Sequence, residues 1–146
     1  MLLLIQRVKH AQVEVAEKTL GAINAGMLVF VCAEPSDTSE TVQKALQKIL
    51  NLRIFSDENG KMNLNVQQVN GGILVVSQFT LAADTQRGNR PSFTKSAAPG
   101  LAKELYEQFI TEAKQNYHTV ASGEFGADMT VSLANDGPIT IPMQIT

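Results

Sequence analysis

The sequence predicts a single α/β domain in which two helices cover a mainly antiparallel sheet. Two observations lead to this prediction. Short apolar runs and alternating apolar and polar residues occupy both ends of the chain, and two segments between them repeat apolar residues every three or four positions. The length of 146 residues is usual for one such domain, and no repeat or linker divides positions 1–146.

The amino-terminal part of the chain predicts two paired strands. Residues 1–15 resemble one long strand, and residues 27–32 form a continuous apolar run typical of a buried strand. Residues 17–19 are expected to form a turn, so that the two strands pair as a hairpin. Gly21 and Gly26 are expected at bends or bulges in this hairpin.

Two helices are expected. The first runs from Ser36 to about Ile54, and Asp37 with Glu40 has the layout of a capping box near the positive end of the helix dipole. The second begins near Pro99, because proline is tolerated in a first turn whose N–H groups have no partner. The expected apolar stripes are Val42, Ala45, Leu46, Ile49 and Leu50 on the first helix, and Leu101, Leu105, Phe109 and Ala113 on the second.

The remaining strands are short. Residues 57–60 predict a turn, and the apolar residues 72–76 predict a buried strand that leads directly into a polar segment. Alternation returns at residues 129–133 and again at 139–145. Between these two runs Asp136-Gly137 favours a hairpin turn.

Composition excludes several classes of protein. No apolar run reaches the roughly 20 residues of a membrane span, so no membrane partner is expected. Cys32 is the only cysteine, which rules out an internal disulfide and indicates a cytoplasmic, reduced protein. A net charge of −2 and a pI near 5.6 argue against a surface that neutralises many phosphates, although contact with the end of a nucleic acid is still allowed.

Conventional catalytic motifs are missing. The sequence has no nucleophile elbow, no glycine-rich phosphate loop and no cluster with metal-ligand spacing, so neither a metal nor a cofactor is expected. His10 and His118 lie far apart and are expected to be structural or surface residues. Cys32 sits in an apolar run, where core packing is favoured over a nucleophilic role.

Two segments could carry chemistry. Ser77-Gln78-Phe79-Thr80-Leu81 follows a buried strand, where main-chain N–H groups become free to bind anions. Thr80 could act as a nucleophile, but no base is apparent beside it, and the alternative is a plain polar strand end. Asn135-Asp136-Gly137-Pro138 could be a simple turn. However, proline after glycine is unusual at a hairpin apex and lowers the cost of a cis peptide bond.

The combination of the two segments resembles the D-aminoacyl-tRNA deacylase family. SQFTL at 77–81 and NDGPIT at 135–140 match the family motifs SQFTL and NxGP(V/I)T. Arg7, RGNRPSF at 87–93 and FGADM at 125–129 are similar as well. The resemblance extends over essentially the whole chain.

The resemblance implies a deacylase-like fold with a barrel-like sheet and a homodimer that hydrolyses D-aminoacyl-tRNA at its acceptor end, the 3′-terminal aminoacyl-adenosine. It also implies a cis Gly137–Pro138 bond whose carbonyls reach the partner's active site and face the substrate's α-amino group, with Arg7 orienting the motif. The segment implied to line the scissile ester is Ser77, Gln78, Phe79 and Thr80. The implied substrate-binding residues are Gly137, Pro138, Arg7, Asn135, Thr140, Phe125 and Met129, the last two near the terminal adenine.

Steric reasoning agrees with this resemblance. An L-residue held by its ammonium group would drive its β-carbon into rigid backbone, whereas a D-residue would point away, and glycine has no β-carbon to clash. An activated ester also needs no side-chain base if main-chain N–H groups near Phe79 and Thr80 stabilise the oxyanion and the ribose hydroxyl assists. The basic residues Arg87, Arg90 and Lys95 are expected either to contact phosphates or to form a solvated loop.

Two other functions are compatible with the residues alone. A generic esterase or amidase using Thr80 would hydrolyse simple esters without RNA. A non-catalytic dimeric module that binds a small ligand or nucleotide would show no deacylation. Neither alternative explains why the two motifs occur together.

Overall fold

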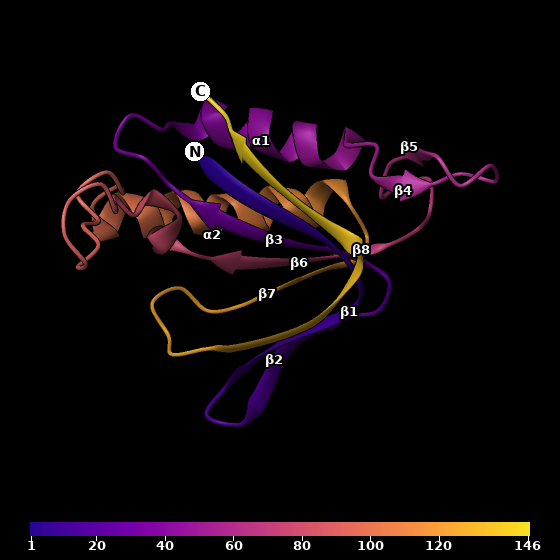
Figure 1. The fold of residues 1–146 in the computed structure, drawn as a ribbon, viewed down its shortest axis with the longest axis horizontal. Helices are drawn as coiled ribbons and strands as arrows, with labels where there is room; N and C mark the ends of the chain where they lie inside the picture. Colours follow the sequence, from indigo (N-terminus) through magenta and orange to yellow (C-terminus); the bar gives the residue numbers. More distant parts are fainter.

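Strand β1 (Leu2–Val15) organises the sheet in the computed structural model, which describes residues 1–146. One edge of β1 pairs antiparallel with β8 (Thr130–Gln144) along almost its whole length. Its other edge pairs antiparallel with β3 (Gly26–Cys32) and then with β2 (Lys18–Ile23). Figure 1 shows β1 and β8 side by side, with both chain ends next to the first helix.

The sheet continues from β3 through two parallel pairings. β3 pairs with β6 (Gly72–Ser77), and β6 pairs with β7 (Val120–Ser122). β2 then returns toward β7, where a β-carbon built on Gly21 would lie 3.1 Å from the Ala121 Cβ, so that only glycine fits comfortably at this approach. The result is a nearly closed, mainly antiparallel sheet, which confirms the predicted fold class.

Helices α1 (Ser39–Asn51) and α2 (Pro99–Asn116) pack against one face of the sheet. Every predicted apolar residue of α1 is buried, and so are Leu105, Phe109 and Ala113 of α2. On β3 and β6, Met27, Val29, Val31, Ile73 and Val75 join the helices in a core of 22 buried residues. The alternate positions Leu28, Leu74 and Val76 face a second, smaller cluster inside the curve of the sheet.

The remaining elements are small. β4 (Phe55–Ser56) and β5 (Met62–Leu64) form a separate hairpin around the predicted turn at 57–60, and this hairpin projects to the side in Figure 1. A short 3₁₀ turn, η1 (Phe79–Ala82), follows β6. Neither long helix combines the length and hydrophobicity that crossing a bilayer requires.

Three local predictions are wrong. The first turn lies at Ala16 and Glu17, both with positive φ, and residues 18–19 already belong to β2, a strand that the sequence did not reveal. Strands 1–15 and 27–32 do pair, but β2 comes between them in the chain. No hairpin forms at 135–138, because both alternating runs pair with the same strand, β1, and belong to one continuous strand.

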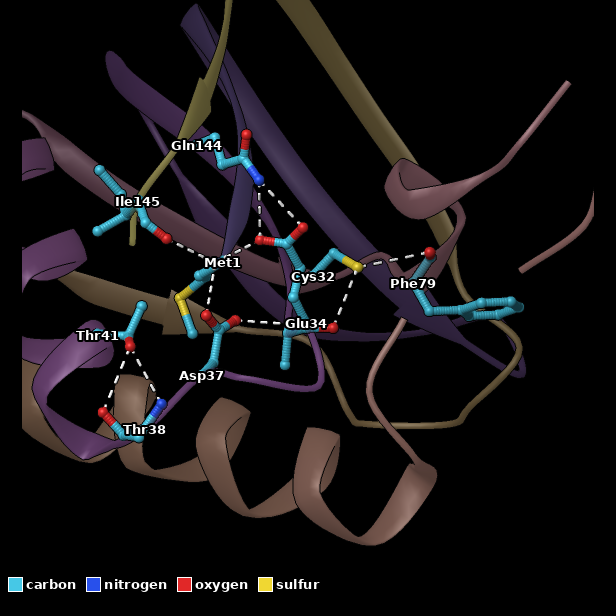
Figure 2. A network of polar contacts seen from close by, with 10 residues as sticks. Met1, Cys32, Glu34, Asp37, Thr38, Thr41, Phe79, Gln144 and Ile145 are labelled. Atoms are coloured by element: carbon cyan, nitrogen blue, oxygen red, sulfur yellow. Dashed lines mark hydrogen bonds and ion pairs between the residues drawn. The ribbon is translucent and has the colours of Figure 1, made fainter. Parts of the chain in front are cut away.

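The expected cap of α1 is also wrong. The helix begins three residues later than predicted, at Ser39, and the Thr38 N–H donates to the Thr41 Oγ1 at 3.1 Å. Asp37 instead accepts a hydrogen bond from the buried ammonium group of Met1 at 2.7 Å. Figure 2 shows this ammonium group between Asp37, Glu34 and the Ile145 carbonyl, where it ties the start of β1 to the end of β8.

Candidate active site

A cavity of about 600 Å³ opens where β6 ends. Ser77, Gln78 and Phe79 line one wall, and the loop from Phe125 to Met129 lines the facing wall. The structure therefore brings together five of the residues that the sequence placed at the site. A more open groove of about 740 Å³ lies between α1 and α2, but amide side chains dominate its lining and it contains none of the predicted site residues.

The first wall is built by a change of backbone geometry. The Gln78 N–H still pairs with the Val31 carbonyl at 2.8 Å, after which the chain leaves the sheet and turns into η1. The Leu81 N–H donates to the Gln78 carbonyl at 3.2 Å and is the first amide bonded within this turn. The turn carries the Phe79 ring outward, where it is 53% exposed and packs edge-on against Phe93 with ring centroids 5.1 Å apart.

Thr80 has no catalytic base. Its side chain is exposed, and its hydroxyl accepts a hydrogen bond from the Gln78 side-chain amide. No histidine or carboxylate contacts that hydroxyl, and Thr80 does not line the cavity. The geometry gives no support to activation of Thr80 as a nucleophile.

Loop residues between β7 and β8 form the second wall. Phe125 and Met129 are half-buried and contribute apolar surface to the cavity. The Phe125 ring packs edge-on against Tyr106 of α2, with centroids 6.1 Å apart. Sequence reasoning did not assign Phe93 or Tyr106 to the site. Phe93 could have been identified from the RGNRPSF segment, in which it is the last residue. For Tyr106 the sequence offered no indication beyond its place in an amphipathic helix.

Cys32 lies behind the first wall as a core residue, as predicted. It is 2% exposed, and its thiol approaches the Phe79 carbonyl at 3.5 Å (Figure 2). Burial raises the pKa of Cys32, which disfavours the reactive thiolate. His10, in β1, and His118, between α2 and β7, are exposed surface residues, which agrees with the role expected for them.

The Gly-Pro motif forms a bulge in β8. Gln6 pairs with Thr140 and Val8 pairs with Asn135, so that Arg7 alone stands opposite residues 136–139. Gly137 has a φ of +151°, and the Gly137–Pro138 bond is cis, as the resemblance implied. Gly137 and Pro138 are both exposed, so the bulge presents its backbone to the outside of the chain.

Two side chains fix the bulge from either side. Arg7 donates from Nε to the Asp136 carbonyl and from Nη1 to the Ile54 carbonyl, each at 2.8 Å, and its side chain is only 13% exposed. Asn135 accepts the Ile139 N–H at 2.8 Å and donates to the Ile139 carbonyl at 3.1 Å and to the Thr140 Oγ1 at 3.0 Å. These bonds give main-chain groups on both sides of the Gly137–Pro138 pair a side-chain partner.

Apart from Thr80, the predicted site residues therefore fall into two clusters within one chain. The cavity cluster contains Ser77, Gln78, Phe79, Phe125 and Met129. The bulge cluster contains Arg7, Asn135, Gly137, Pro138 and Thr140, and none of these lines the cavity of the same chain.

The basic loop lies beside the cavity. Lys95 forms an ion pair with Asp84 at 3.3 Å, whereas Arg87 and Arg90 are exposed and have no ion-pair partner in the chain. Phe93, in the same loop, lines the cavity. No group of three or more His, Cys, Asp or Glu side chains is arranged to hold a metal ion.

A cavity without a nucleophile–base pair, next to a strand end with free amides, suits the hydrolysis of an already activated ester. The family model for D-Tyr-tRNA(Tyr) deacylase matches residues 4–144. The D-aminoacyl-tRNA deacylases of Variovorax paradoxus and Pseudomonas putida are each 56% identical over 142 residues, covering 97% of this chain and 97% and 98% of the relatives. The chain belongs to the D-aminoacyl-tRNA deacylase family, whose members are hydrolases that act on D-aminoacyl-tRNA.

Solved structures agree with this fold. A c-Myc DNA unwinding element binding protein superposes with a TM-score of 0.93 at 36% identity, covering 99% of this chain and 98% of that protein. A probable eukaryotic D-amino acid tRNA deacylase superposes with a TM-score of 0.86 and 97% coverage of both chains. The second protein is 16% identical, so that its likeness supports the fold alone.

Proposed function

We propose that this enzyme acts as a homodimer in which each cavity receives the aminoacyl-adenosine of a tRNA and the Gly137–Pro138 bulge of the partner completes the site. The observation that carries the proposal is the separation of the two clusters. One chain has a cavity whose lining lacks the Gly-Pro backbone, together with a projecting bulge whose residues line none of that cavity. A second copy of the chain supplies what each cluster lacks.

The cavity suits the nucleoside at the 3′ end of a nucleic acid. Phe125 and Met129 offer an aromatic face and a polarisable thioether, which are surfaces on which an unstacked base packs well. Arg87 and Arg90 lie in the adjoining loop and are proposed to contact the terminal phosphates. The net charge of −2 fits a partner held at its tip only, and the proposed place of action is the cytoplasm.

The bulge is proposed to select the D-configuration. In this arrangement the Gly137 and Pro138 carbonyls accept hydrogen bonds from the substrate's α-ammonium group. The β-carbon of an L-residue would then meet main-chain atoms that Arg7 and Asn135 hold in place. No rotamer relieves such a clash, and every 1.4 kcal/mol of it corresponds to about tenfold discrimination.

Hydrolysis then needs positioning and oxyanion stabilisation. Water adds to the ester carbonyl, the carbonyl–oxygen bond to the ribose breaks, and the tRNA oxygen leaves with a proton while the D-amino acid departs. The Phe79 and Thr80 amides precede the first bonded amide of η1, so they are available to the developing oxyanion. The neighbouring ribose hydroxyl is proposed to assist the proton transfer.

Mixed dimers test whether the site crosses subunits. One variant carries Phe125→Ala in the cavity, and the other carries Gly137→Val in the bulge, where an added β-carbon would lie 2.7 Å from the Ile139 side chain. A cross-subunit dimer of the two variants contains one doubly defective site and one intact site, so the purified mixed dimer should have about half of the wild-type activity. Co-expression, in which about half of the dimers are mixed, should restore about a quarter. If each chain formed its own site, mixing would restore nothing.

A further inference from the structure

One buried side chain joins the two walls of the cavity. Tyr106 of α2 is 4% exposed, and its hydroxyl lies 3.1 Å from the Val75 carbonyl and 2.9 Å from the Gly123 carbonyl. Val75 directly precedes Val76, the first residue of one wall that lines the cavity. Gly123 precedes Phe125, the first cavity residue of the other wall, by two positions. A single oxygen atom therefore connects the two segments that end in the cavity.

The ring of Tyr106 supports the same two walls. It packs edge-on against Phe125 at an interplanar angle of 64°. Tyr106 also borders a small enclosed space of about 20 Å³ together with Ser77, Phe79 and Phe125, directly behind the cavity lining. The ring thus packs against one wall and borders the same small space as residues of the other.

The hydroxyl stays protonated at neutral pH. Burial raises the pKa of Tyr106, and the opposing hydrogen bonds with the backbone at Ser77 and Gly123 do not cancel this effect. The protonated hydroxyl has one hydrogen, which the Val75 and Gly123 carbonyls share. The Gly123 N–H also donates to the Val75 carbonyl at 3.0 Å, so that the two segments are held together at this point.

We infer that Tyr106 is a positioning residue that sets the distance between the Ser77–Phe79 wall and the Phe125–Met129 wall, and thereby the affinity for the aminoacyl-adenosine. The inference rests on the proposed function, which places that nucleoside in the cavity. Because Tyr106 contacts the walls rather than the ester, its removal should weaken substrate binding and leave the chemical step unchanged.

Tyr117 provides a matched control. It follows α2, is 7% exposed, and its hydroxyl also lies between two main-chain carbonyls, those of Val66 and Gly71. None of these residues lines the cavity. Replacing either tyrosine with phenylalanine removes one oxygen atom and the same kind of buried bond, so the two variants should lose comparable stability.

The experiment compares Tyr106→Phe and Tyr117→Phe with D-tyrosyl-tRNA as substrate, with thermal unfolding measured in parallel. The expected result is a KM raised about three- to tenfold by Tyr106→Phe with an unchanged kcat, the effect of one lost hydrogen bond, and wild-type kinetics for Tyr117→Phe. Equal KM values for the two variants, or a loss confined to kcat, would overturn the inference.

A third variant separates this inference from the proposed function. Phe125→Ala removes a wall residue directly and should raise the KM by more than Tyr106→Phe does. If Phe125→Ala left the KM unchanged, the placement of substrate in the cavity would be wrong. If Phe125→Ala raised the KM while Tyr106→Phe matched Tyr117→Phe, the cavity assignment would stand and the role of Tyr106 alone would fail.

Discussion

The cavity and the bulge are built in opposite ways. The cavity is lined mainly by apolar side chains from a strand end, a basic loop and the β7–β8 loop. The bulge projects main-chain atoms, and its polar side chains, Arg7 and Asn135, are used to hold that main chain in place. The two regions should therefore differ in their tolerance to substitution. Changes of side chains in the cavity should alter activity gradually, whereas the bulge depends on the geometry of its backbone.

The two regions also differ in how they depend on the rest of the fold. The cavity requires β6, α2 and the β7–β8 loop to pack correctly, since each contributes to a wall. The bulge requires that four residues of β8 stand opposite Arg7 of β1, and that Arg7 and Asn135 keep their hydrogen bonds to the main chain. In the proposed mechanism the cavity binds the nucleoside, and the bulge discriminates between D- and L-amino acids. Substitutions in the cavity should therefore change the affinity for the substrate, and substitutions in the bulge should change the D/L selectivity.

Glycyl-tRNA gives the largest expected contrast. Glycine has no β-carbon that could clash with the main chain of the bulge, so the bulge should accept it. We expect hydrolysis within about tenfold of D-tyrosyl-tRNA and at least about 100-fold faster than L-tyrosyl-tRNA, which corresponds to a clash of about 3 kcal/mol. Parallel deacylation assays measure the three rates. A wild-type enzyme that leaves glycyl-tRNA intact would show that selection does not depend on the β-carbon.

Arg7→Ala should loosen the bulge without altering the cavity. The Asp136 and Ile54 carbonyls lose a charged donor, so the ratio of D- to L-tyrosyl-tRNA hydrolysis should fall by about tenfold or more, and unfolding should become easier by about 2 kcal/mol. Arg53→Ala is the matched control, because Arg53 also donates from Nε to a main-chain carbonyl, that of Asn63, but in the β4–β5 hairpin. An unchanged ratio for Arg7→Ala would remove Arg7 from the selective machinery.

Thr80→Val should have a smaller effect. If the Thr80 hydroxyl is not a nucleophile, kcat for D-tyrosyl-tRNA should fall less than about tenfold, whereas loss of a true nucleophile costs about 10⁴-fold or more. Thr85→Val, in the loop outside the cavity lining, serves as the control for an exposed threonine. Complete inactivity of a folded Thr80→Val protein would restore the nucleophile hypothesis.

Glu34→Gln should affect neither region. Burial alone would raise the pKa of Glu34, but hydrogen bonds from the Met1 ammonium group and from Gln144 outweigh it, so its pKa is lowered. This stabilisation is present above the unfolded pKa of about 4.3 and is lost as the pH falls through the lower folded value. At pH 7 the variant should be less stable by about 1 kcal/mol with unchanged deacylation.

Urea unfolding at several pH values measures this effect. The stability gap between the wild type and Glu34→Gln should narrow as the pH falls below about 4. A gap that persisted in acid would show that the ion pair with Met1 is not its source.

The sequence predicted the elements with long, regular apolar patterns. β1, β3, β6 and α2 were found because a buried strand or helix face constrains many consecutive residues. β2 and β7 were missed because they are short and lie where polar and small residues are mixed. The capping error at Asp37 had another cause, since its actual partner is the ammonium group at the distant start of β1.

The site shows the same limit. Local patterns and family resemblance marked Ser77–Thr80, Phe125, Met129 and the Gly-Pro motif, but the hairpin predicted at 135–138 is wrong because strand partners are not a local property. Tyr106 was missed for a similar reason. It stands next to Leu105 in an ordinary helix, and its importance comes from two carbonyls, of Val75 and Gly123, in other parts of the chain.

Chirality is the most direct test of the proposed mechanism. The measurement is the rate at which the wild-type enzyme releases tyrosine from D-tyrosyl-tRNA and from L-tyrosyl-tRNA prepared on the same tRNA. If the main chain of the Gly137–Pro138 bulge excludes L-residues, the D-form should be hydrolysed rapidly and the L-form at least about 100-fold more slowly. Equal rates for the two forms would contradict the selective role proposed for the Gly137–Pro138 bulge.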